Sequence, residues 1–239
     1  MLAKNNNKIK SQYFDFKKEL KFNLNKISEY RGWNGLFIIK FDILKGENLH
    51  NSFINSNYQI LLNKEKIFVV TKGKIELKLN GSSFFLKEFD AVDFITELDE
   101  YEIKCTQDAT MYMISSKDLE SYKGKPIFFN FKKNTIIKDL WGGNCISRPY
   151  EGKGLTLVLF DLKPGFKFED KGHANEQITW LIKGEMNFHA DGNHKLLSCN
   201  DGVDIGPNHV HGGISNGAIG FDAFFPKRQE LKYRKDLKK

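Results

Sequence analysis

The chain has 239 residues, enough for one large domain or two small ones, and 40% of them are hydrophobic, which excludes an intrinsically disordered protein. The formal charge of +7 is spread along the chain, and acidic residues interrupt the one modest basic cluster at 227–239, so nucleic-acid binding is not expected. Three distant cysteines without a CxxC pair favour a reducing compartment. With no signal-peptide core and no apolar run near the roughly 20 residues of a membrane span, we expect a cytoplasmic protein without membrane association.

Strand patterns dominate the chain. Only residues 14–30 show a weak helical periodicity, and they are the best candidate for a helix. The segments that follow are short, rich in β-branched and aromatic residues, and end at Gly, Asn or Asp turns; they are 35–46, 66–81, 155–165 and 177–192. The sequence therefore predicts an all-β fold.

The strands fall into two copies of one unit. Residues 63–81 align with 174–192 at an offset of 111, which pairs Gly73 with Gly184. Residues 35–46 align with 154–165 at an offset of 119, so the first copy carries about eight extra residues between these blocks. A β unit of this length, repeated once, predicts two tandem jelly-roll barrels, which we place at 1–125 and 126–239.

The second copy carries residues with the spacing of a known motif: Gly165, Lys171, His173, Gln177 and Gly184, followed later by Pro207 and His211. These residues resemble the two motifs of the cupin superfamily, in which the first motif has His-x-His where this chain has Lys171 and His173. The resemblance implies a double-stranded β-helix barrel in each half, hence a bicupin. It also implies a divalent metal (Fe, Ni, Mn, Co or Zn) held by His173, Gln177 and His211, although the lysine leaves open that none is bound.

Strand alternation supports this interpretation independently. Alternate residues of a strand share a face, so 171, 173, 175 and 177 are expected on one side. A barrel closes such strands on one another, which brings their inward side chains together. Imidazole, amide and carboxylate groups gathered in this way suit a divalent metal.

A third stretch extends the resemblance. Residues 221–228, FDAFFPKR, are similar to the Asp-x-Phe-x-Pro-x-Arg strand of a narrower cupin group. That group includes enzymes that open unsaturated uronate rings and the bicupin isomerase of bacilysin biosynthesis. The resemblance implies that Asp222 and Arg228 are catalytic and that Phe224 and Arg228 contact substrate. Trp180 is expected to shape the same barrel and to bind substrate with them.

Lys171 leaves three alternatives open. It bends aside and leaves a weaker metal site, its ammonium replaces the metal and pairs with a carboxylate such as Asp222, or it binds an anionic substrate group directly. In the last two cases it is a member of the active site.

The first copy lacks the corresponding residues. At the offset of 111, the positions of the second copy's ligands and catalytic residues are filled by Ile60, Leu62, Lys66, Glu100, Met111, Met113 and Lys117. We therefore expect the first barrel to be structural, packing against the second barrel or against another subunit.

The leading functional hypothesis is a metal-dependent isomerase or lyase that acts on a small carboxylated, sugar-like or keto-acid substrate. Asp222 would move a proton and Arg228 would hold the substrate carboxylate. Two alternatives remain: a metal-free cupin that binds a small anion or carbohydrate without catalysis, and an oxygen-dependent dioxygenase. Either way, the expected partner is a small anionic molecule, and the expected state is a monomeric bicupin or a homodimer.

Overall fold

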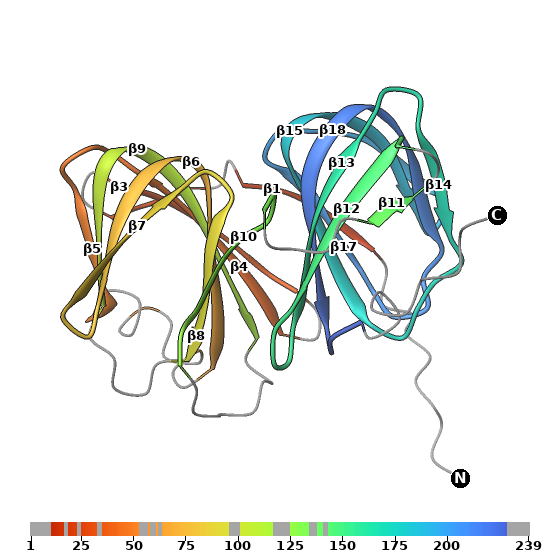
Figure 1. Cartoon of the computed structure of the whole chain (residues 1–239). Coiled ribbons are helices and arrows are strands. Elements are labelled where there is room, and N and C mark those ends of the chain that lie inside the picture. Colours follow the sequence, from red (N-terminus) through yellow and green to blue (C-terminus); the bar gives the residue numbers. More distant parts are fainter. Residues whose placement is uncertain are drawn as a thin grey trace, which may run out of the picture.

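The computed structural model describes residues 11–228 except 17–18, 23–24, 33–34, 53–56, 58–60, 62–63, 96–100, 117–124, 134–137 and 141–142. The described residues form eighteen β-strands in two nine-stranded antiparallel sheets, each curled into a barrel, and the two barrels stand side by side (Figure 1). The all-β, two-barrel prediction is confirmed. Within the described residues, no helix has the length and apolar character needed to cross a membrane.

The sheet of the first barrel has the order β10-β8-β6-β9-β4-β3-β2, with β5 paired to β9 and β7 paired to β6. Its strands are β2 (Glu19–Phe22), β3 (Asn25–Arg31), β4 (Leu36–Ile43), β5 (Asn48–His50), β6 (Glu65–Leu79), β7 (Ser82–Lys87), β8 (Asp90–Ile95), β9 (Tyr101–Ser116) and β10 (Ile127–Asn130).

The sheet of the second barrel has the order β1-β17-β15-β18-β13-β12-β11, with β14 paired to β18 and β16 paired to β15. Its strands are β1 (Gln12–Asp15), β11 (Lys138–Leu140), β12 (Cys145–Glu151), β13 (Thr156–Leu162), β14 (Lys167–Asp170), β15 (Glu176–Ala190), β16 (Asn193–Ser198), β17 (Asp201–Ile205) and β18 (His211–Phe225).

The backbone repeats as the sequence predicts. The long strands β6 and β15 each have fifteen residues, and each bends at a glycine with positive φ, +78° at Gly73 and +77° at Gly184. A Cβ added there would lie 2.0 Å from the Asp108 carbonyl oxygen or 1.7 Å from the Gly217 carbonyl oxygen. Only glycine fits both positions, because the left-handed conformation and the close backbone neighbour each exclude a side chain.

The helix predicted over residues 14–30 is wrong. That segment contains the end of β1 and the strands β2 and β3, which form an antiparallel pair from Glu19 opposite Ser28 to Phe22 opposite Asn25. β3 also pairs with β4 along Lys26–Arg31, and Ile27 is buried in the first barrel. Pairing within the sheet and burial outweigh a weak local helical preference.

The two barrels exchange edge strands. β1, at the start of the chain, pairs with β17 of the second barrel, with Gln12 opposite Asp204. β10, which follows the predicted boundary at 125, pairs with β8 of the first barrel, with Ile127 opposite Asp93. The sheets therefore do not coincide with the segments 1–125 and 126–239, because each barrel completes its sheet with a strand from beyond that boundary.

An apolar layer joins the barrels. Side chains alternate along β6 and β15, so Ile67 and Val69 on β6, and Ile178 and Trp180 on β15, point into this layer rather than into their own barrels. Both faces of these strand segments are buried, which explains the unbroken apolar run 67–70 of β6, whereas β15 carries Gln177 and Thr179 on its inward face. The buried members of the layer are Phe16, Leu36, Ile38, Ile67, Val69, Phe89, Ala91, Tyr112, Ile114, Phe131, Leu155, Leu157, Leu159, Ile178, Trp180, Phe221 and Ala223.

Buried acids of the first barrel are contacted by the second barrel at the edge of this layer. The Tyr150 hydroxyl on β12 donates to Asp93 Oδ2 on β8 at 2.7 Å. The backbone N–H groups of Lys153 and Gly154 donate to the two carboxylate oxygens of Glu65 at 2.6 and 2.9 Å. The internal repeat gives an equivalent tyrosine–aspartate contact in which the tyrosine belongs to the first barrel and the aspartate to the second.

In the opposite direction, Tyr30 of β3 donates to Asp204 Oδ2 of β17 at 3.1 Å. Each tyrosine ring stacks on a phenylalanine of the exchanged strand: Tyr30 on Phe14 at 3.7 Å and Tyr150 on Phe129 at 3.8 Å between ring centroids. The exchanged strands and the buried carboxyl groups thus form one pseudo-symmetric junction between the barrels.

We expect this junction to make stability depend on pH. Burial and the neighbouring Glu65 raise the pKa of Asp93 to about 7, above the ordinary value near 3.8 that it regains on unfolding. The folded protein therefore binds more protons between these two values, so the free energy of unfolding falls as pH rises from about 4 to about 7. In Asp93→Asn, chemical denaturation at pH 5 and pH 8 should show a smaller fall than in the wild type. The exposed change Glu88→Gln is the control, and an undiminished fall in Asp93→Asn would contradict this origin.

Candidate functional site

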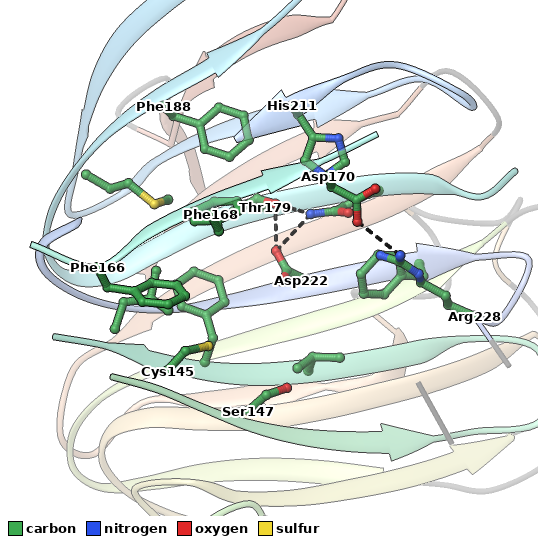
Figure 2. A pocket seen from close by; sticks show the side chains of 16 residues that line it. Cys145, Ser147, Phe166, Phe168, Asp170, Thr179, Phe188, His211, Asp222 and Arg228 are labelled. Carbon is green, nitrogen blue, oxygen red and sulfur yellow. Dashed lines mark hydrogen bonds and ion pairs between the residues drawn. The ribbon is translucent and has the colours of Figure 1, made fainter. Parts of the chain in front are cut away.

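A cavity of about 130 Å³ lies inside the second barrel. Its walls come from β12, β13, β14, β15 and β18 (Figure 2). The lining residues are Cys145, Ser147, Val158, Phe160, Leu162, Phe166, Phe168, Asp170, Gln177, Thr179, Met186, Phe188, His211, Asp222, Phe224 and Arg228.

Three potential metal ligands converge beside this cavity. One side-chain ligand atom from each of Asp170, His173 and His211 lies within 4.8 Å of the others. Both histidines are buried, and Asp170 is partly buried. Gln177 adjoins the group, because its Oε1 lies 2.9 Å from His173 Nε2. The predicted residues His173, Gln177 and His211 are therefore brought together, and Asp170 joins them.

Local strand geometry places Asp170. β14 alternates, so Phe168 and Asp170 face the cavity while Lys167 and Glu169 are exposed. The pairing of β14 with β18 sets Asp170 opposite His211. Asp170 was not predicted from the sequence, although it alternates with the apolar residues 166 and 168 and so shares their strand face.

Lys171 does not take part in the site. Its side chain is exposed and does not line the cavity, so the expectations that it replaces the metal or binds substrate there are corrected. Residue 171 does not share a strand face with 173 and 177, because the strand stops at Asp170 and the next begins only at Glu176. In between, Gly172 turns the chain with φ +96° while its N–H donates to Asp170 Oδ1 at 2.9 Å. Alternation holds only within a continuous strand.

Hydrogen bonds and burial prepare the histidines for coordination. His211 Nδ1 lies 2.9 Å from the carbonyl oxygen of His209, an acceptor, so this nitrogen carries the proton and Nε2 keeps its lone pair. His173 Nδ1 is buried and has no hydrogen-bond partner. Burial lowers the pKa of both imidazoles, and the charge of Arg228 lowers them further. Neutral imidazoles are the form that binds a metal.

Arg228 is placed against the same cluster. Its Nη2 donates to Asp170 Oδ2 at 3.0 Å, and its backbone N–H donates to Thr156 Oγ1 at 3.0 Å. Burial opposes ionisation of Asp170, but the hydrogen bond and positive charge of Arg228 outweigh it and hold the pKa of Asp170 below its ordinary value. Asp170 is therefore an anion in contact with a cation.

Asp222 lies deeper in the barrel. Its Oδ1 accepts hydrogen bonds from Thr179 Oγ1 at 2.6 Å and from Gln177 Nε2 at 3.2 Å, as Figure 2 shows. Burial of this partly exposed residue in the barrel raises its pKa to about 6, although the hydrogen bond from Thr179 acts in the opposite direction. A carboxyl group with such a pKa exchanges a proton near neutral pH.

The two predicted aromatic contacts have different outcomes. Phe224 lines the cavity and packs edge-on against His173, with 5.5 Å between ring centroids. Trp180 does not line it: its side chain points from β15 into the apolar layer between the barrels and stacks on Phe221. Trp180 is one residue out of phase with Gln177 and Thr179, so the expectation that it binds substrate is corrected.

Comparison with known proteins rests on structure. No protein-family model and no curated protein matches the chain. Solved structures that match include a Pseudomonas aeruginosa protein provisionally named as glyoxylate-induced, with 10% identity over 90% of this chain and 88% of that chain (TM-score 0.73). A cupin 2 conserved barrel domain protein from Leptotrichia buccalis matches with 13% identity over 90% and 96% (TM-score 0.62). A deletion mutant of Bacillus subtilis oxalate decarboxylase matches with 10% identity over 90% and 76% (TM-score 0.66).

The fold is that of a bicupin. Nearly the whole length of the chain superimposes on proteins of this architecture, so both barrels, and not only the second, have the cupin fold. At these identities the likeness establishes the fold alone.

The first barrel of this bicupin has no equivalent ligand group among the residues that the structure describes. Strand pairing sets Met113, rather than the expected Met111, at the position of Asp222, because Met113 pairs with Phe68 and Ile39 as Asp222 pairs with Thr179 and Val158. Met113 is buried in the apolar interior of this barrel, and Ser115 stands at the position of Phe224. Lys66, at the position of Gln177, is also buried, and its Nζ donates to the Leu61 carbonyl oxygen at 2.7 Å. The other four positions named from the sequence, at 60, 62, 100 and 117, lie outside the described residues.

Residues 170 and 171 provide a matched test of the ligand group. Asp170→Asn removes the carboxylate that the cluster offers and should lower the affinity for Mn²⁺ or Zn²⁺ by at least about tenfold. Lys171→Ala should leave that affinity unchanged, because the lysine is exposed and does not line the cavity. Competition with a chelating dye, with elemental analysis of the purified proteins, measures both. Loss of metal in Lys171→Ala with retention in Asp170→Asn would contradict the assignment.

Proposed function

We propose that this bicupin is a metal-dependent isomerase or lyase whose substrate is a small carboxylated molecule bound in the second barrel. One observation carries the proposal: a candidate ligand cluster, a carboxyl group and a guanidinium meet at one cavity. His211 of the ligand cluster, the carboxyl group of Asp222 and the guanidinium of Arg228 all line this cavity. Convergence of groups suited to electrophilic, proton-transfer and anion-binding roles is typical of an active site.

The residues suited to hold the metal are Asp170, His173 and His211, with Gln177 beside them. Two neutral imidazoles and oxygen donors suit Mn, Fe, Co, Ni or Zn. The unpartnered His173 Nδ1 and the His211 tautomer fit this use. When bound, a divalent ion supplies Lewis-acid polarisation of a substrate carbonyl or hydroxyl oxygen.

Asp222 is the proposed proton carrier. Thr179 and Gln177, two residues apart on β15, both donate hydrogen bonds to Oδ1 of Asp222 and so orient this oxygen. Since the group is partly buried and lines the cavity, a bound substrate can contact the carboxyl directly. The residue would move a proton between carbon and oxygen, or between two carbons.

Arg228 is the proposed carboxylate anchor. Its guanidinium lines the cavity within reach of the ligand cluster and orients Asp170 by their hydrogen bond. A planar guanidinium suits a carboxylate because the two groups match in geometry and charge.

The structural neighbours support a small acid and a metal. One is named for glyoxylate and another for oxalate, and the Bacillus subtilis oxalate decarboxylase has Mn(II) centres. Transfer of these properties to the present chain is part of the proposal.

An oxygen-dependent dioxygenase is the second candidate. Two histidines with one carboxylate, Asp170, form the ligand type of non-haem iron oxygenases. Oxygen uptake on addition of Fe²⁺ and a carboxylated substrate separates this activity from isomerisation, which consumes none.

Proton exchange tests the leading proposal before the product is known. Metal-loaded protein is incubated in D₂O with a panel of 2-oxo and unsaturated carboxylic acids, and NMR follows deuterium entering carbon-bound positions. Asp222→Asn should slow this exchange on the order of 10²–10⁴-fold while metal content stays unchanged.

The control is Asp161→Asn, which alters a half-buried carboxylate on β13 that does not line the cavity. Ligand-induced thermal stabilisation without exchange, in the metal-loaded wild type, would overturn the enzyme proposal in favour of a binding module.

A further inference from the structure

The cavity has two chemically different ends. Asp170, His211 and Arg228 supply charge and metal-binding atoms at one end. Away from them, Figure 2 shows Phe166 at the far side of the same space, whereas Phe188 stands beside His211 with 6.2 Å between the ring centroids. A ligand that fills the cavity must therefore present different chemistry to the two ends.

The apolar end is a continuous aromatic wall. Phe166 and Phe168 stack with 6.2 Å between ring centroids, and Phe168 lies at the same distance from Phe188. Met186 adds a flexible thioether to this wall. Phe166 and Phe188 are buried at 8% and 1% exposure, so their rings are fixed before a ligand binds.

This wall offers few hydrogen-bond partners. Among the lining residues away from the charged end, the hydroxyl-bearing side chains are Ser147 and Thr179, and the Thr179 hydroxyl already donates to Asp222. A polyhydroxylated ligand would bury most of its hydroxyl groups here without partners, after losing their hydrogen bonds to water. A hydrocarbon body of the same shape would lose none and would gain the burial.

The cavity is larger than a very small ligand. Its volume of about 130 Å³ is close to the roughly 150 Å³ of an apolar protein cavity that binds benzene, whereas a two-carbon acid would occupy only the charged end. The remaining aromatic wall would then have no contact with the ligand.

We propose that the ligand of this cavity is a monocarboxylate with an apolar body about the size of a six-membered ring, rather than a sugar acid or a two-carbon acid. The body lies against Phe166, Phe168 and Phe188, and the carboxylate lies at the charged end. There Arg228 supplies a permanent positive charge, and the ligand cluster adds a second when metal is loaded. The carboxylate anchor rests on the proposed function, whereas the preference for an apolar body rests on the wall alone.

Cyclohexanecarboxylate and galacturonate are a matched pair of probes. Each carries one carboxylate on a six-membered ring, and the sugar acid adds hydroxyl groups and a ring oxygen. Calorimetric titration of metal-loaded protein should show cyclohexanecarboxylate binding at least tenfold more tightly. In the series acetate, butanoate, hexanoate, affinity should rise about fourfold for each buried methylene.

Phe168→Ala tests the wall within the protein. Phe168 is half-buried on the short strand β14, so its removal disturbs the core less than that of a fully buried ring. The variant should lose about tenfold in affinity for cyclohexanecarboxylate and keep its metal content. Phe85→Ala, at an exposed ring of the first barrel, should change neither. If Phe168→Ala does not fold, the probe pair in the wild type still decides the question.

Galacturonate binding as tightly as cyclohexanecarboxylate, or an affinity that does not change with chain length, would overturn the inference. Either result in protein that holds metal leaves the proposed function intact. Conversely, a preference for cyclohexanecarboxylate in protein that takes up no metal would support the apolar wall and defeat the metal-dependent function.

Discussion

The buried layer between the two barrels is the constraint on which the rest of the structure depends. The first halves of β6 and β15 are buried on both faces because each borders its own barrel and this shared layer. At the edges of the layer, Tyr150 and Tyr30 each reach a buried aspartate of the other barrel, and exchanged strands cover both contacts. Each barrel is completed by the other, so neither half of the chain carries its whole sheet.

This layer also packs against the outer face of the strands that carry the candidate site. Trp180 follows Thr179 on β15 and Phe221 precedes Asp222 on β18, and the two rings stack with 5.4 Å between centroids. Tyr112 of the first barrel packs on Trp180 at 5.6 Å. The first barrel, which has no ligand group among its described residues, thereby fixes the strands that carry Thr179 and Asp222. A rigid supporting shell of this kind is what a proton-transfer site needs.

Comparison of the two barrels shows how one β unit serves two purposes. The long strands β6 and β15 have the same length and bend at equivalent glycines. In one barrel Met113 fills the interior. In the other, Asp222 at the equivalent strand position borders a cavity. The backbone therefore supplies the frame, and a few inward side chains decide whether the frame encloses a core or a site.

The sequence by itself determined the all-β class, the internal repeat and the convergence of His173, Gln177 and His211, because strand composition, repeat spacing and motif spacing are local properties of the chain. Only the tertiary structure decided which strands complete each barrel, that Trp180 faces the layer between barrels, and that Asp170 rather than Lys171 joins the site. The physical reason is that these outcomes depend on where a strand stops and what packs behind it. A single turn at Gly172 breaks the alternation, and pairing between distant segments leaves no local signature.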